Sequence, residues 1–202
     1  MNRRRHLLTT MLVAATLATG CALTRKAPPR ELQYFSPELS MQAPSAAPGP
    51  ATTVPLRLGR VDRTDVLGHR IVRRTSAVEL ALYESRRWTE NPDAYVRRAL
   101  LQALFDERPF AATLARSAPT LDIEVLAFEE VLTPRHAGRV QLRYVLHDHR
   151  TVLASGQLVA EVPVTGDGFD AVVLAIAAAN RDVAARVAQR VVQTLCPDAT
   201  AH

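Results

Sequence analysis

Apolar and polar side chains alternate strictly over residues 139–144, Leu146 continues the apolar series, and this alternation constrains the fold most strongly. Successive side chains of a β-strand point to opposite faces of a sheet, so such a segment has one buried face and one solvent face. The buried face needs a cover from other elements, which favours an α+β fold. The apolar members of the alternation are Val140, Leu142, Tyr144 and Leu146.

Related patterns predict five further strands and two helices. The short helix begins after Asn91, a good N-cap, with Pro92 at its first position, and should end near Asp106. The long helix should run over residues 169–195, with Asn180 on its apolar stripe at either a break or a polar contact. The order is βββα-βββα: one mostly antiparallel sheet with both helices packed on one face. The other strands are expected at residues 54–62, 70–73, 78–88, 121–132 and 152–162.

The N-terminus has the pattern of a bacterial secretion signal over residues 1–20. Three arginines precede an apolar stretch of about twelve residues, which is shorter than the ~20 that span a bilayer. The small residues before Cys21 resemble the lipobox of bacterial lipoproteins. That resemblance implies cleavage between Gly20 and Cys21 and acylation of Cys21, and Ala22 favours an outer-membrane address. The alternative is an ordinary signal peptide without lipid.

Composition divides the mature chain into a tether and a domain. Residues 21–53 are rich in proline and alanine with little apolar periodicity, which is typical of a tether. The exception is Tyr34-Phe35, an aromatic pair that we expect to dock on the domain or on a neighbouring subunit. Residues 54–197 should form a single domain, followed by a tail at residues 198–202.

The composition argues against several functions. The chain has 25 basic and 20 acidic residues, and three arginines lie in the signal, so the mature net charge of +2 makes no case for nucleic-acid binding. No catalytic motif, phosphate-binding loop or cofactor motif is present. His147 and His149 are two residues apart, so on a strand they would share one face of the sheet and could bind a transition metal. However, they lie at a predicted turn, and the sequence offers no obvious third ligand. We therefore expect no enzyme activity, no cofactor and no metal.

Trp88, the only tryptophan, lies where a predicted strand meets a helix. One interpretation makes it a packing anchor that closes one end of the core, with an arginine stacked on its ring. The other makes Trp88, Arg87, Tyr34 and Phe35 a partner-docking site. The sequence leaves both open.

Several short sequence motifs, taken in their order along the chain, resemble those of the ABC-type transport auxiliary lipoproteins, a family that includes the lipoprotein of the paraquat-inducible operon. The resemblance covers most of the mature chain, and single motifs are less specific than their order after a lipobox. The matching strings are Tyr34-Phe35-Ser36-Pro37, Leu58-Gly59-Arg60-Val61, Ile71-Val72-Arg73-Arg74, Arg87-Trp88-Thr89-Glu90-Asn91-Pro92 and Tyr95-Val96-Arg97-Arg98-Ala99-Leu100.

The resemblance implies a non-enzymatic component of a lipid-transport system, lipid-anchored on the periplasmic side of the outer membrane of a Gram-negative bacterium. Its partner would be a membrane-anchored protein with mammalian-cell-entry (MCE) domains. Assembly into a homo-oligomer is also conceivable, because sheet faces and edges can form repeated contacts. A second hypothesis is an outer-membrane lipoprotein that binds and activates a cell-wall synthase.

Overall fold

The computed structural model describes residues 31–38 and 53–197. The predicted signal peptide with Gly20, Cys21, the predicted tail and most of the predicted tether lie outside these residues. No helix within the described residues is long and apolar enough to span a membrane.

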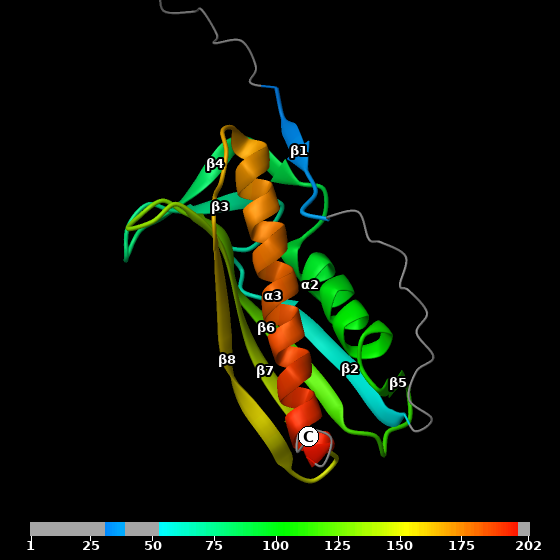
Figure 1. Cartoon of the computed structure of the whole chain (residues 1–202). Helices are drawn as coiled ribbons and strands as arrows, with labels where there is room; N and C mark the ends of the chain where they lie inside the picture. The colour runs from blue at the N-terminus through cyan, green and yellow to red at the C-terminus, as the bar shows by residue number, and fades with distance from the viewer. Residues whose placement is uncertain (1–30, 39–52, 198–202) are drawn as a thin grey trace, which may run out of the picture. The chain divides into compact units, whose positions relative to one another are not determined.

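One side of the sheet is an antiparallel meander of three long strands, the last of which lies at the edge (Figure 1). Strand β6 (Thr120–Val131) pairs with β7 (Ala137–His147), which pairs with β8 (Val152–Pro163). The side chains of β7 alternate between buried and accessible positions, and the four apolar residues picked out by the alternation are all buried. The sequence pattern thus correctly identified the strand and its buried face.

The other edge of β6 is shared by two strands. β2 (Val54–Arg63) runs parallel to its first half and β3 (Arg70–Arg74) to its second half. β4 (Leu80–Trp88) pairs antiparallel with β3 and parallel with β1 (Gln33–Phe35), while β5 (Phe110–Ala112) lies parallel to β2. The longest pairings are antiparallel, as predicted. The parallel pairings of β2 and β3 with β6 arise because a helical crossover returns the chain from β4 to β6, and parallel neighbours require a long connection of this kind.

Two helices pack on one face of this sheet (Figure 1). Helix α2 (Pro92–Leu101) begins with proline after Asn91 and continues into a π-helical turn, η2 (Gln102–Asp106). Helix α3 (Phe169–Leu195) follows Gly168, whose φ of +83° is a conformation that glycine tolerates best. The predicted α+β architecture with both helices on one face is confirmed.

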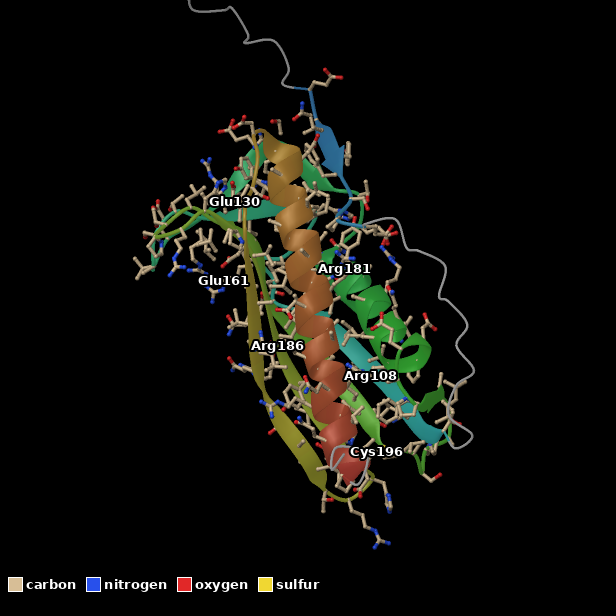
Figure 2. All side chains as sticks on the ribbon, in the orientation of Figure 1. Arg108, Glu130, Glu161, Arg181, Arg186 and Cys196 are labelled. Carbon is tan, nitrogen blue, oxygen red and sulfur yellow. The ribbon has the colours of Figure 1, made fainter. Side chains whose placement is uncertain are left out.

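Close packing holds α3 against the meander. At Gly138 of β7 an added Cβ would lie 2.3 Å from the backbone nitrogen of Ile176, so glycine permits the contact. Asn180 is buried on the helix and donates from Nδ2 to the Tyr95 carbonyl of α2 at 3.3 Å, so of the two predicted alternatives the structure has the polar contact and not the break. On the wet side of α3, Arg186 reaches toward β8 (Figure 2) and donates to the Val159 carbonyl at 2.6 Å.

Candidate partner-docking surface

The four residues proposed for partner docking meet on two neighbouring strands. In the parallel pair β1–β4, Tyr34 is the register partner of Arg87, and Phe35 is the register partner of Trp88. Register partners point to the same face of a sheet and successive residues to opposite faces. The structure therefore sorts the set into two pairs on opposite faces, which sequence spacing alone could not show.

Trp88 belongs to the core. Its side chain is 0% exposed. Its ring meets those of Phe128 and Tyr95 edge-on, with centroids 5.5 Å and 6.3 Å apart. Among the described residues no guanidinium stacks on the indole; Arg98 stacks on the Tyr95 ring instead, 5.1 Å from its centroid. As placed, Trp88 has the position of a packing anchor and presents no surface to a partner.

Phe35 joins an aromatic cluster at the first turn of α3. Its ring centroid lies 4.8 Å from that of Phe169, which in turn lies 5.0 Å from Tyr83 of β4. The Arg86 guanidinium lies 3.9 Å from the Phe169 centroid and 4.6 Å from that of Tyr83. Sequence reasoning missed Phe169, Tyr83 and Arg86 because they come from separate elements and share no local pattern.

In the outward pair, the Tyr34 side chain is exposed and the Arg87 side chain is held by hydrogen bonds. Tyr34 is 62% exposed, and Leu32 beside it in sequence is 47% exposed. Arg87 donates to the backbone carbonyls of Tyr83 at 3.0 Å and of Arg86 at 2.9 Å, and a further bond reaches Glu84. These three bonds stabilise the second half of β4, where its register with β3 is irregular. We name the exposed pair Leu32 and Tyr34 the docking patch.

Two buried carboxylates of β6 hold the neighbouring strands. Glu130 accepts hydrogen bonds from the Tyr83 hydroxyl and from His136 Nε2, the latter at 2.7 Å. Glu129 accepts from Arg74 Nε at 2.7 Å. Burial raises the pKa of Tyr83, and the Glu130 bond and charge raise it further, while Arg86 and Arg73 partly oppose them. Each acid has a partner on another strand, so the network tethers β3 and β4 to β6.

An open cavity of about 810 Å³ lies beside this network. Its charged lining residues are Arg74, Arg135, Arg139 and Glu161; Figure 2 labels Glu161 on β8. Arg74 and Arg139 both lie within ion-pair distance of Glu129. The cavity therefore offers charge and hydrogen bonds from these side chains.

The remaining candidates from the sequence lie at the opposite end of the meander. His147 contacts Asp122 Oδ2 at 3.2 Å and the Asp148 carbonyl at 2.9 Å, and Asp148 closes the β7–β8 turn by accepting from the Arg150 and Thr151 amides. Those two amide bonds lower the Asp148 pKa. Within the described residues no three His, Cys, Asp or Glu side chains are grouped to hold a metal.

Comparison with known proteins adds a family and a fold. The sequence model of the ABC-type transport auxiliary lipoprotein component matches residues 38–188. No curated protein matches the chain. A Xanthomonas campestris protein of the DUF330 family superposes with a TM-score of 0.68 at 19% identity, covering 83% of this chain and 99% of that one. A hypothetical protein from Chlamydia trachomatis gives a TM-score of 0.52 at 10% identity, covering 73% and 99%. These likenesses concern the fold alone.

Proposed function

The chain belongs to the family of ABC-type transport auxiliary lipoprotein components, and from this premise we propose that it is a non-enzymatic adaptor of an MCE-type lipid-transport system. In this proposal acylated Cys21 anchors the protein in the outer membrane from the periplasmic side. The folded domain then binds the MCE-domain protein of the same system.

The observation that carries the proposal is the docking patch. The side chains of Leu32 and Tyr34 are large and exposed, and they lie at the sheet edge beside β4. In the sequence they follow the first part of the predicted tether, which begins at Cys21. Aromatic side chains are enriched in protein interfaces because they combine a large apolar area with a polar tip. The buried carboxylates Glu129 and Glu130 are engaged in pairs that hold neighbouring strands, which supports binding rather than turnover.

A capture experiment tests the proposal. Protein carrying a tag after His202 is isolated from solubilised envelopes, and the co-purifying proteins are identified by mass spectrometry. We expect the MCE-domain protein of the same operon among them. Tyr34→Ala should reduce its recovery, whereas Gln33→Ala, an exposed change on the same strand, serves as the matched control.

The second candidate, activation of a cell-wall synthase, rests on the same tethered α+β arrangement. It predicts that a different protein co-purifies from the same envelopes. Recovery of a peptidoglycan synthase without any MCE-domain protein would replace the transport proposal with this one.

A further inference from the structure

We infer that residues 33–38 form a releasable strap, whose docking on the domain sets how far the domain can stand from its N-terminal anchor. The strap comprises β1 and the three residues after it. As an account of reach, this inference rests on the proposed anchoring at Cys21; the strap's docking and release do not.

The strap is attached by few contacts. Its backbone pairs with only three positions of β4, and the Phe35 carbonyl accepts the Thr89 amide at 3.0 Å. Phe35 is half-buried against Phe169, and Pro37 is buried beside a small cavity between α2 and α3. The other side chains of the strap are exposed.

One ionic contact closes the strap at its C-terminal end. Glu38 pairs with Arg98 of α2, and Arg98 also pairs with Glu90 at 2.7 Å. Partial burial opposes the charge of Arg98, but the Glu90 and Glu38 interactions outweigh burial and raise the Arg98 pKa. Both pairs are substantially exposed to solvent, where such ion pairs contribute little. The attachment therefore depends chiefly on Phe35 and Pro37.

Docking of the strap shortens the length of chain that is free between Cys21 and the domain. Only 11 residues separate Cys21 from Gln33, whereas 32 residues separate Cys21 from Val54 of β2. At ~3.4 Å per residue, a docked strap limits the reach from Cys21 to about 40 Å, and a released strap extends the limit to about 110 Å. A partner that holds the domain farther than the shorter limit must therefore peel the strap from β4.

The same arrangement makes release compatible with a folded domain. The strap is the terminal strand on the β4 side of the sheet, and its removal leaves the β3–β4 and β3–β6 pairings intact. Local opening of such a weakly attached element is the kind of low-energy event that hydrogen exchange detects. We expect the strap to open before any part of the β6–β7–β8 meander.

Hydrogen exchange gives the first test. In the full-length chain the Thr89 amide reports docking, because it donates to the Phe35 carbonyl of the strap. Phe35→Ala should raise the exchange rate of Thr89 at least tenfold, while amides of β7 keep their rates. The matched control Gln33→Ala should leave Thr89 unchanged. Equal Thr89 rates in Phe35→Ala and the wild type would overturn the proposal.

Mechanical pulling gives the second test. The full-length chain, carrying Cys196→Ser, is held by a handle on the Cys21 thiol and another at the C-terminus. We expect a first step at low force of up to about 70 Å, from the 21 residue steps between Gln33 and Val54. Phe35→Ala should remove this step and preserve the later unfolding event. A single unfolding event without the first step would refute the strap.

Neither measurement uses a lipid, so failure of the strap is distinguishable from failure of the anchor. If Cys21 is not the anchor, both tests still report the strap, and only its consequence for reach is lost.

Discussion

Replacing Trp88 by alanine tests whether this residue serves packing or docking. The indole is 0% exposed and lies edge-on to Phe128 and Tyr95. Removing a buried tryptophan leaves a cavity and costs about 3–5 kcal/mol. Folded domains have free energies of unfolding of only about 5–15 kcal/mol, so the change would remove a large share of the stability. For a domain of this size the melting temperature should fall by about 6–20 °C.

Urea denaturation followed by circular dichroism measures the effect without relying on tryptophan fluorescence, which the variant lacks. Tyr34→Ala is the matched control, because an aromatic side chain that is 62% exposed should change the free energy of unfolding by no more than about 0.5 kcal/mol. The packing interpretation would be refuted if Trp88→Ala kept the wild-type stability yet lost its protein partner. That result would make Trp88 an interface residue.

Two further predictions concern the helix layer and the anchor. Gly138→Ala should destabilise the domain by about 1–3 kcal/mol or more, because the added Cβ would meet backbone atoms of Ala175 and Ile176. Gly68→Ala is the control and should not destabilise it, because no atom lies within 4 Å of the added Cβ. Equal denaturation midpoints for the two variants would contradict this packing. Cys21→Ser should leave the protein out of the membrane fraction, since several acyl chains anchor a protein stably where one is marginal; membrane retention after signal cleavage would exclude lipidation as the anchor.

The sequence was informative wherever burial follows a regular period. Alternation located β7 and its buried face, and the Asn91-Pro92 pair located the start of α2. Asn180 on the apolar stripe of α3 indicates either a break or a polar contact, and the structure has the second, its bond to Tyr95 in an unbroken helix. These features are local, so a single segment contains the whole signal.

The features that the sequence did not reveal depend on distant partners. β1 and β5 have three residues each, too few for a periodic pattern, and each exists because a longer strand offers it an edge. The division of the candidate site into an inward and an outward pair depends on the β1–β4 register. Register between segments about fifty residues apart is set by packing in three dimensions, here by Phe35 against Phe169.

Direct binding to the MCE-domain protein is the measurement closest to the central claim. The purified full-length chain is titrated against the purified MCE-domain protein of the same operon by surface plasmon resonance. The account predicts saturable binding that Tyr34→Ala weakens and Gln33→Ala preserves. Absence of saturable binding, with both proteins shown to be folded, would contradict the adaptor function proposed for this lipoprotein.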